Sequence, residues 1–494
     1  MTPPSNRLSK SRFVAGLQCH KLLWWMVHEP TAVELQPDIV LQDRFDQAAQ
    51  VGALARARHP GGVLIEPAHG QYDARIRHTK GLLDAKTPVI FEAAFEGDGV
   101  FAAVDILERS GDGYTMTEVK AANSLKDEHI PDAAVQAHVL QQNGLTLGTV
   151  NVLHLNREFH HPNHGDLFQQ QDVSQEVANA VSGIPEEIKA QQTMLQGPLP
   201  TVPIGRHCAE PRECPFKDRC WPQDPDHISK LFNVGIKRAA EYLRKGITSI
   251  SQIPLAQKMP HAARRQLRAM KENRLIVDPG LKEALEPFNG RLGFLDFETI
   301  SRAVPVWDGM APWEQAAAQF SYHERQPGGT YTHTAFLAEG PQDARPPLAK
   351  AMLEATKNAE RVVMYTPFER TRIRGLQEAL PELAADLLAL ENKLIDLHPV
   401  IRDYVYHPGF LGSFSIKYVL KPLVPELSYS DLVIVDGLVA SVEIARLLFV
   451  ADKIRPEERD RVRQDLLDYC ERDTWAMVRL VERLTELANN PAAS

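Results

Sequence analysis

The chain shows two hydrophobic periodicities that predict strands and helices in alternation. Apolar and polar residues alternate in the runs TPVIFEAAF, GVFAAVDILE and GYTMTEVKA, which Gly, Asp and Pro separate. A period of two predicts half-buried β-strands, whereas apolar residues every three to four positions predict helices. Runs with helical spacing accompany these strands, so we expect residues 1–225 to form a mixed α/β domain.

A helical segment is predicted next, over residues 226–285. The run HISKLFNVGIKRAAEYLRKGITSISQIP has apolar residues at helical spacing, interrupted at Gly235 and Gly246. It is similar to a helix-hairpin-helix element, in which backbone amides at a Gly-containing turn meet a phosphate. We therefore expect a helical connector here.

A second α/β region is predicted over residues 286–494. The apolar run GRLGFLDFE indicates a buried strand, and alternating strand and helix patterns follow it. The region ends in a helix predicted from RDRVRQDLLDYCERDTWAMVRLVERLTELANN. The predicted fold class is thus α/β, with a helical connector between two domains.

Composition places the protein among globular, non-membrane proteins. The 494 residues are 44% apolar and 24% charged, a length that favours several domains over one core. The first residues, MTPPSNRLSKSRF, lack the apolar stretch of an export signal, and no run approaches the ~18 apolar residues of a membrane span. We expect a cytoplasmic protein without a membrane partner.

The cysteines indicate a metal or cluster site. Three of the five cysteines fall within HCAEPRECPFKDRCW, residues 207–221. In a chain without an export signal thiols stay reduced, so ligation of a metal is favoured over a disulfide framework.

Charge is distributed unevenly along the chain. The net charge is −9, yet residues 229–275 hold eleven Lys and Arg against two acidic residues. A basic block in an acidic protein is expected to contact phosphate, and we select Lys237, Arg238, Arg264 and Arg265 as nucleic-acid-binding residues. The alternative is a solvated helical face.

Carboxylates, a lysine and a glutamine recur in order within the first domain. Asp105 lies at the end of an apolar strand, and Glu118 and Lys120 lie on one face of the next. Asp105 and Glu118 can share Mg²⁺ or Mn²⁺, while Lys120 can orient water and stabilise charge on a phosphate. Glu92 can add a metal ligand, and Gln136 faces the site from a helix. This series predicts phosphodiester hydrolysis.

The last domain carries a second set of carboxylates. Asp296 and Glu298 lie at i and i+2 on one face of a strand, and Tyr469 and Asp473 lie at i and i+4 on one face of a helix. Three carboxylates and a phenol can therefore converge.

Several motifs of the first domain resemble the RecB-like PD-(D/E)xK nucleases. They are GLQCHKLLWW, VDILE, TEVKAANSLKDEHIPDAAVQAHVL and the late cysteine group, and the likeness is strongest to the iron–sulfur branch that includes AddB-type and CRISPR-adaptation exonucleases. The resemblance implies a restriction-endonuclease-like fold and a [4Fe–4S] cluster on Cys19, Cys208, Cys214 and Cys220. Thiolates suit Zn²⁺ almost equally well, so zinc is the alternative.

The last domain resembles the DEDD exonucleases of the RNase H-like fold, the DnaQ class. The resemblance implies two metal ions held by the strand and helix carboxylates, and a tyrosine that orients the attacking water. The family's middle motif, Asn followed by Phe-Asp, aligns with MYTPFERTRI, where Thr366 replaces the Asn and Glu369 the Asp. Glu369 is our choice for the remaining metal ligand, and Asp396 is the alternative.

The whole chain resembles a bacterial family that joins these two modules. We therefore predict an enzyme, a metal-dependent nuclease acting on DNA through two sites, and the resemblance implies 3′–5′ exonuclease activity for the second. One alternative is a nucleic-acid-binding or scaffold protein with one or both sites degenerate. Another is an RNA-processing exonuclease.

Overall fold

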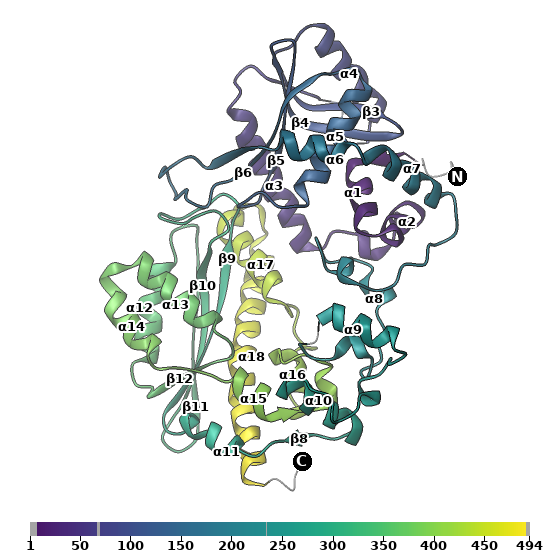
Figure 1. Ribbon diagram of the computed structural model, residues 1–494. Helices are drawn as coiled ribbons and strands as arrows, with labels where there is room; N and C mark the ends of the chain where they lie inside the picture. The colour runs from purple at the N-terminus through teal and green to yellow at the C-terminus, as the bar shows by residue number, and fades with distance from the viewer. Residues whose placement is uncertain (1–6, 67–69, 234, 491–494) are drawn as a thin grey trace. The chain divides into compact units, whose positions relative to one another are not determined.

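The computed structural model describes residues 7–66, 70–233 and 235–490 and has a mixed α/β architecture (Figure 1). It divides into two compact units. The first comprises residues 1–221 together with 302–314, and the second comprises residues 222–301 and 315–494. The predicted connector, residues 226–285, falls within the second unit. Each unit is described by itself below.

The first unit contains a seven-stranded mixed sheet with the strand order β2-β3-β4-β5-β6-β7, and β1 pairs with β4. Its strands are β1 (Leu8–Ser9), β2 (Val63–Leu64), β3 (Val89–Gly97), β4 (Val100–Ser110), β5 (Gly113–Lys120), β6 (Leu147–Leu155) and β7 (Phe168–Asp172). Its helices are α1 (Lys10–Gln18), α2 (His20–His28), α3 (Ile39–Ala57), α4 (Tyr72–Asp84), α5 (His129–Gln142), α6 (Ser174–Val181), α7 (Ile184–Leu195) and α8 (Lys217–Cys220).

The alternating runs of the sequence form the centre of this sheet. The inward-facing side chains of β3 and β4, among them Phe95 and Val104, pack in one core with Val135 and Val139 of α5. The prediction of strands over the three runs is confirmed, although Asp105 lies in the middle of β4 and not at its end.

Strands β4 and β5 separate beside the predicted first site. Their antiparallel pairing extends from Ser110 and Gly113 to Ile106 and Thr117. Beyond this pair, the Asp105 carboxylate accepts a hydrogen bond of 2.6 Å from the backbone N–H of Val119. The last residues of β5 are therefore not paired with β4, and their side chains lie beside it.

The second unit contains a five-stranded sheet with the order β11-β10-β9-β12-β13 and a two-stranded sheet of β8 and β14. Its strands are β8 (Ile276–Val277), β9 (Leu292–Ser301), β10 (Gln315–Arg325), β11 (Tyr331–Leu337), β12 (Arg361–Met364), β13 (Leu394–Asp396) and β14 (Val405–Tyr406). Its helices are α9 (Gly235–Arg244), α10 (His261–Glu272), α11 (Leu281–Ala284), α12 (Arg345–Thr356), α13 (Phe368–Ala379), α14 (Ala384–Glu391), α15 (His398–Tyr404), α16 (Ile416–Leu423), α17 (Gly437–Phe449) and α18 (Pro456–Asn489).

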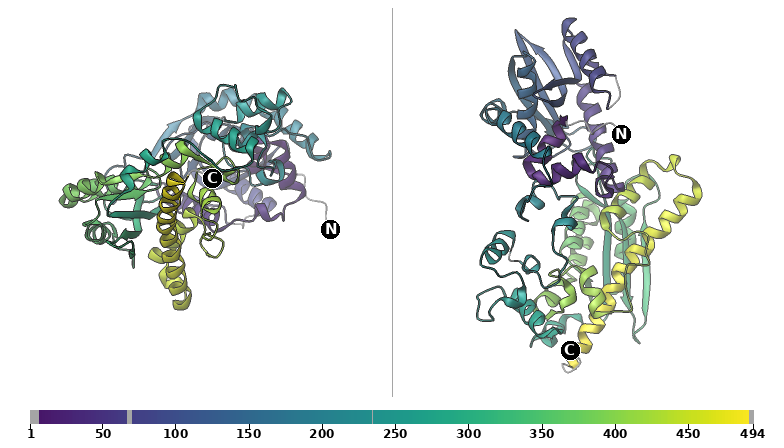
Figure 2. Two further views of the ribbon diagram at one scale, coloured as in Figure 1. Left: turned by 90° about the horizontal axis from the view of Figure 1, so that it is seen from below. Right: turned by 90° about the vertical axis from the view of Figure 1, so that its right-hand side faces the viewer.

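Strand β9 divides its side chains between two helical layers. Leu295 and Phe297 pack in a core with residues of α12, α13 and α14. Asp296 and Glu298 alternate with them and therefore face the other side of the sheet, where α17 and α18 lie against β9. Figures 1 and 2 show the long helix α18 crossing this sheet.

The predicted connector is helical and has a small core of its own. Ile228, Leu231, Ile250, Ile253, Ala263 and Leu267 pack together within it. Helix α10 ends at Asn273, which adopts a left-handed conformation with φ of 47°, and β8 follows it. Across the described ranges, no helix is both long and apolar enough to cross a membrane.

Candidate functional site

Three carboxylates of the second unit converge between β9 and α18. One oxygen from each of Asp296, Glu298 and Asp473 lies within 4.8 Å of the others. Glu298 and Asp473 are each 8% exposed, so little water reaches the group. The strand spacing i, i+2 and the helix facing it thus bring together the three acidic residues that the sequence selects.

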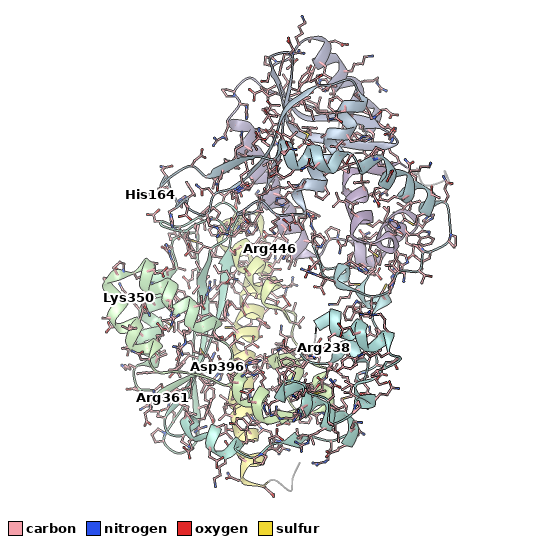
Figure 3. The ribbon with its side chains drawn as sticks, viewed as in Figure 1. His164, Arg238, Lys350, Arg361, Asp396 and Arg446 are labelled. Atoms are coloured by element: carbon pink, nitrogen blue, oxygen red, sulfur yellow. The ribbon has the colours of Figure 1, made fainter. Side chains whose placement is uncertain are left out.

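Glu369 joins this group from the first turn of α13. Its side chain is buried and hydrogen-bonds with Asp296, and its Oε2 has no partner among the described atoms. Asp396 lies at the end of β13, where its Oδ1 accepts a hydrogen bond of 2.9 Å from the backbone N–H of His398. The Asp396 carboxylate therefore bonds to the first residue of α15, and Figure 3 shows its position at this part of the sheet.

Two tyrosines and one lysine surround the carboxylates. Tyr469, on α18, and Tyr429 both hydrogen-bond to Asp473 through their hydroxyls. The Lys417 ammonium lies 5.4 Å from the centre of the Tyr469 ring and donates to the backbone carbonyl of Val435 at 2.5 Å. The site therefore contains hydrogen-bond donors as well as carboxylates.

The electrostatics of this group are dominated by burial and mutual repulsion. Burial, followed by the charge of Asp473, raises the pKa of Asp296 and of Glu298 well above their ordinary values. Burial raises the pKa of Glu369 to about 8 and that of Asp473 to about 6, in spite of the hydrogen bonds to both residues. Four carboxylates, three of them buried and the fourth partly buried, carry little compensating positive charge, so the group favours binding of cations.

The start of α17 leaves room above Glu298. A Cβ atom on Gly437, the first residue of α17, would lie 3.6 Å from Oε2 of Glu298 and 4.0 Å from the Tyr469 hydroxyl. A larger side chain would occupy the space that a ligand of Glu298 needs. The oxygen donors, their burial and this space fit hard divalent cations such as Mg²⁺.

Cys470 touches the same group. Its sulfur lies 3.5 Å from Oδ2 of Asp296, and the side chain is fully buried. The thiol therefore donates a hydrogen bond from α18 to Asp296 on β9.

In the first unit, several side chains of the predicted site hydrogen-bond to Glu118. Its Oε1 accepts hydrogen bonds from Lys120 and Lys10, each at 2.7 Å, and its Oε2 accepts one of 2.7 Å from Gln136. Lys120 also donates to Asp132. The structure thus brings Lys120 and Gln136 onto Glu118 as the sequence predicts, and adds two further residues.

A pocket of about 210 Å³ lies beside these residues. Glu92, Asp105 and Glu118 line it together with Arg56 of α3. Glu92 has a φ of +57°, in the left-handed region that side chains rarely adopt. Such backbone strain is common at functional sites, where surrounding structure holds a side chain in one direction.

In this first site, lysine ammonium groups offset the carboxylate charges more fully than any cation does in the acidic group of the second unit. Burial, then repulsion by Glu118, raises the pKa of Asp105 to about 8. Burial would also raise the pKa of Glu118, but the ammonium groups of Lys10 and Lys120 outweigh it and lower that pKa. Burial acts against the charge of Lys120, yet Glu118 and Asp132 hold its pKa above the ordinary value. The pocket can therefore hold a divalent cation beside a protonated lysine.

Sequence reasoning missed Lys10 and Asp132. Lys10 is separated from Glu118 by 108 residues and belongs to no motif, and β1 pairing with β4 brings it close. Asp132 precedes Gln136 by four residues on α5, so it shares a helix face with a selected residue. That spacing could have identified Asp132.

The four selected cysteines meet in the first unit. Cys19 lies between α1 and α2, Cys208 and Cys214 lie in the later loop, and Cys220 ends α8. All four line one cavity together with Leu22 and Trp25. Gln18 fixes the two segments by donating to the carbonyls of His207 and Arg212 at 2.8 and 2.7 Å.

A single zinc ion and a four-iron cluster require different distances between the four cysteine sulfurs. Zinc binds thiolates at about 2.3 Å in a tetrahedron, which places the sulfurs about 3.8 Å apart. Among the described residues, no three of the cysteine sulfurs lie within 4.8 Å of one another. A four-iron cluster binds each thiolate to a different iron and so needs wider spacing. Burial raises the pKa of Cys214 to about 11, and a bound cation would favour its thiolate.

The basic residues of the connector differ in exposure. Arg238 on α9 and Arg264 on α10 are exposed (Figure 3 labels Arg238). Lys237 belongs to α9, but its side chain lies outside the described residues. Arg265 is 4% exposed and donates to Asp278 at 2.7 Å and to the carbonyls of Arg402 and Asp403. This corrects the selection of Arg265, because a side chain committed to these partners cannot contact phosphate.

Comparison with known proteins gives one family match. Residues 293–415 match the family described as Domain of unknown function (DUF2779). The match begins within β9, includes Asp296, Glu298 and Glu369, and ends before α18, which carries Asp473. No curated protein matches the chain.

Proposed function

We propose that the protein is a metal-dependent nuclease with two phosphodiester-hydrolysing sites. The N-terminal domain is a PD-(D/E)xK module and the C-terminal domain a DnaQ-like exonuclease of RNase H-like fold. DNA is the proposed substrate. The observation that carries the proposal is the convergence of Asp296, Glu298 and Asp473 within 4.8 Å, the last two of them buried, with Glu369 beside them.

In the second site, Asp296, Glu298, Glu369 and Asp473 would hold the metal ions. Bound Mg²⁺ or Mn²⁺ supplies charge stabilisation and an activated water. Burial and the charge of Asp473 raise the pKa of Tyr469, so its phenol keeps its proton. Tyr469 donates this proton to Asp473, which leaves its oxygen as an acceptor that can orient the attacking water, and the phenol does not act as a base. Its hydrogen bond to Asp473 positions it for this role.

In the first site, Asp105 and Glu118 would hold a cation, with Glu92 as a further ligand. Lys120 keeps its proton because Glu118 and Asp132 attract it. Its ammonium therefore stabilises negative charge on the phosphate and orients water. Gln136 fixes the Glu118 carboxylate from the helix, and the positive φ of Glu92 turns its side chain relative to the strand.

The four cysteines would hold a [4Fe–4S] cluster with a structural role. All four line one cavity, and thiolates are the ligands that iron–sulfur clusters bind. The cluster would join the α1–α2 segment to the chain around α8, far apart in sequence. Exposed cations of the connector, Arg238 and Arg264 among them, support contact with a nucleic-acid backbone.

The test is hydrolysis of end-labelled DNA by the full chain, with Mg²⁺ or Mn²⁺ and with chelator. Wild-type protein is expected to release nucleotides only with metal, and the double variant Asp105→Asn, Asp296→Asn is expected to be inactive. Both substitutions keep side-chain size and remove charge from metal ligands. Activity equal in the double variant and the wild type would overturn the proposal.

A parallel assay separates DNA from RNA processing. Matched DNA and RNA oligonucleotides of one sequence are incubated with the same protein, and cleavage rates are compared. We expect faster cleavage of DNA. Binding without cleavage of either substrate, at any metal concentration, would instead support the nucleic-acid-binding scaffold with degenerate sites.

A further inference from the structure

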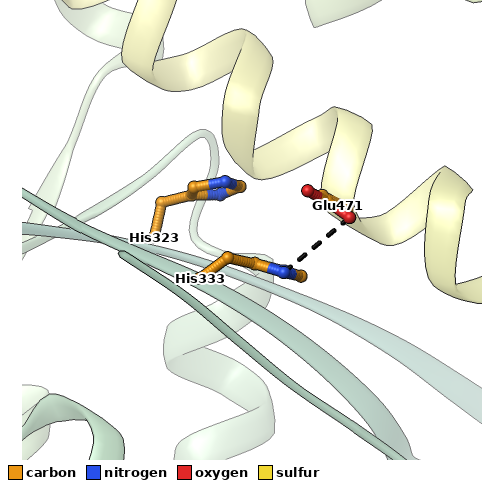
Figure 4. Close-up of side chains that lie close together, drawn as sticks. All are labelled: His323, His333 and Glu471. Atoms are coloured by element: carbon orange, nitrogen blue, oxygen red, sulfur yellow. Dashed lines mark ion pairs between the residues drawn. The ribbon is translucent and has the colours of Figure 1, made fainter. Parts of the chain in front are cut away.

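A group of two histidines and one glutamate lies beside the acidic residues of the second unit and includes none of them. His323 is on β10, His333 on β11 and Glu471 on α18, and a ligand atom from each lies within 4.8 Å of the others. Figure 4 shows the two imidazole rings lying one above the other, with Glu471 reaching toward them from the helix. The ring centres are 4.6 Å apart, and Nδ1 of His333 lies 3.7 Å from Oε2 of Glu471.

We propose that His323, His333 and Glu471 form a binding site for a transition-metal ion of the zinc class. Two imidazoles and one carboxylate are ligands that Zn²⁺ accepts, and three protein ligands leave a fourth position for water. The proposal does not rest on the nuclease activity. No part of the nuclease chemistry uses these three residues.

Two hydroxyls hold the imidazoles in the orientation that a ligand histidine needs. Nδ1 of His323 lies 2.8 Å from the hydroxyl of Thr474, and Nε2 of His333 lies 2.9 Å from the hydroxyl of Ser321. One nitrogen of each ring is thereby engaged, which leaves the other for a metal. Hydrogen bonds of this kind fix the tautomer and the ring direction at metal sites.

The two hydroxyls also contact each other, at 2.8 Å. Ser321 and Thr474 therefore form a single polar layer beneath both rings. Thr474 is fully buried and Ser321 is 1% exposed, so this layer is fixed. Such a rigid support is the arrangement that pre-organises metal ligands.

The environment of the rings favours the neutral imidazole that binds metal. His323 is 5% exposed, and Trp475 lies against it with ring centres 5.3 Å apart. Burial, together with the neighbouring His333, lowers the pKa of His323 to about 4. Glu471 is half exposed, so an ion can reach the group from solvent.

The three ligands come from three elements, which gives the ion a structural role. It would join β10 and β11 to α18, the helix that carries Tyr469 and Asp473. Ser321 pairs with Asp296 across β10 and β9, so the polar layer lies next to the acidic group. Metal binding is therefore expected to stabilise the position of α18 on the sheet.

The test measures bound metal on the full chain. Protein is first treated with chelator, supplied with excess Mg²⁺ to occupy hard-cation sites, and then titrated with Zn²⁺ by calorimetry. The bound zinc is counted by mass spectrometry after gel filtration. We expect the variant His333→Ala to bind one zinc ion fewer than the wild type. The control variant His261→Ala, at an exposed position at the start of α10, should bind as many ions as the wild type.

Thermal unfolding provides a second readout. Zn²⁺ should raise the unfolding midpoint of the wild type by about 5 °C more than that of His333→Ala. If His333→Ala by itself lowers the unfolding midpoint in chelator, the variant Glu471→Gln, on the helix surface, is used in place of His333→Ala. Glu486→Gln, also on α18, is the matched control for Glu471→Gln. Equal zinc stoichiometry and equal midpoint shifts in wild type, His333→Ala and Glu471→Gln would overturn the proposal. The group would then be a hydrogen-bonded histidine stack.

Discussion

Lys10 and Lys120 donate to the same carboxylate oxygen, Oε1 of Glu118, each at a distance of 2.7 Å. They come from distant parts of the chain, one from the start of α1 and the other from the end of β5. Two cations on one oxygen lower the pKa of Glu118 despite its burial. The pair keeps this carboxylate ionised and ready for a metal.

Removing Lys10 should therefore weaken the first site without abolishing it. In Lys10→Met, Lys120 and Gln136 still hold Glu118, and we expect cleavage by the N-terminal module to fall by roughly tenfold. Lys80→Met, on the surface of α4, is the matched control and should cleave at the wild-type rate. The measurement is the initial rate in a protein whose second site carries Asp296→Ala. An unchanged rate in Lys10→Met would show that Lys10 has only a structural role.

The cysteine group should be testable by iron content. Anaerobically purified protein is expected to be brown and to contain about four irons per chain. Cys214→Ser should lose the iron and lower the unfolding midpoint, because ligand binding and folding are coupled. Cys470→Ala changes the one cysteine outside the group and should retain the iron. Stoichiometric zinc without iron in the wild type would contradict the cluster.

Stability should depend on pH through Glu369. Its pKa in the fold is raised to about 8 from an ordinary value of 4.5, so the fold favours the protonated form. That stabilisation is complete below about pH 4.5 and is lost as the pH rises through about 8. Glu369→Gln has no such proton to lose. Between about pH 4.5 and pH 8, in chelator, we expect the free energy of unfolding of Glu369→Gln to rise relative to that of the wild type. The expected rise is roughly 1 kcal/mol per pH unit.

Urea unfolding at several pH values measures this difference. With Mg²⁺ in place of chelator, the trend should weaken because the metal stabilises the ionised carboxylate of the wild type. Glu382→Gln, in the turn after α13, is a control that should show a flat difference. A flat difference for Glu369→Gln in chelator would remove Glu369 from the buried acidic group.

Charge reversal in the connector should weaken DNA binding. Arg238→Glu with Arg264→Glu is expected to lower the affinity and to flatten its salt dependence, by about 0.7–0.9 in the logarithmic slope for each lost phosphate contact. Arg361→Glu with Arg461→Glu, at exposed positions elsewhere in the same unit, is the control. Unchanged affinity and slope in the connector variant would make these arginines a solvated face.

Arg265 should behave differently from its neighbour Arg264. Its side chain is buried and joins Asp278 to two backbone carbonyls near the end of α15. Arg265→Ala removes the side-chain donor to both carbonyls and leaves Asp278 paired with Arg268 alone, and we expect a loss of about 3 kcal/mol in the free energy of unfolding. Arg264→Ala should change stability by less than about 0.5 kcal/mol. Equal effects of the two substitutions in urea unfolding would contradict the burial of Arg265.

Local patterns were enough to predict much of the fold and of the acidic group. The period of two across β9 separates Leu295 and Phe297 from Asp296 and Glu298, so the strand and its polar face follow from the sequence. Asp473 and Tyr469 follow from one helix turn in the same way. Both patterns depend on neighbours within a few residues.

Contacts between distant segments could not be read from these patterns. Lys10 reaches Glu118 only because β1 pairs with β4, and Lys417 approaches Tyr469 from a separate helix. Arg264 and Arg265 are adjacent and alike in charge, but successive helix residues point in different directions and only one of them is exposed. Charge alone could not distinguish them.

The central claim is that two independent sites hydrolyse phosphodiester bonds, and one pair of variants tests it most directly. Lys120→Ala removes a cation from the first site, and Asp296→Ala removes a ligand from the second. We expect Lys120→Ala to lose cleavage by the N-terminal module by about 10²–10⁴-fold while keeping stepwise release from a 3′ end, and Asp296→Ala to show the reverse. If Asp296→Ala keeps every activity of the wild type while Lys120→Ala loses them all, the claim of a second active site is contradicted.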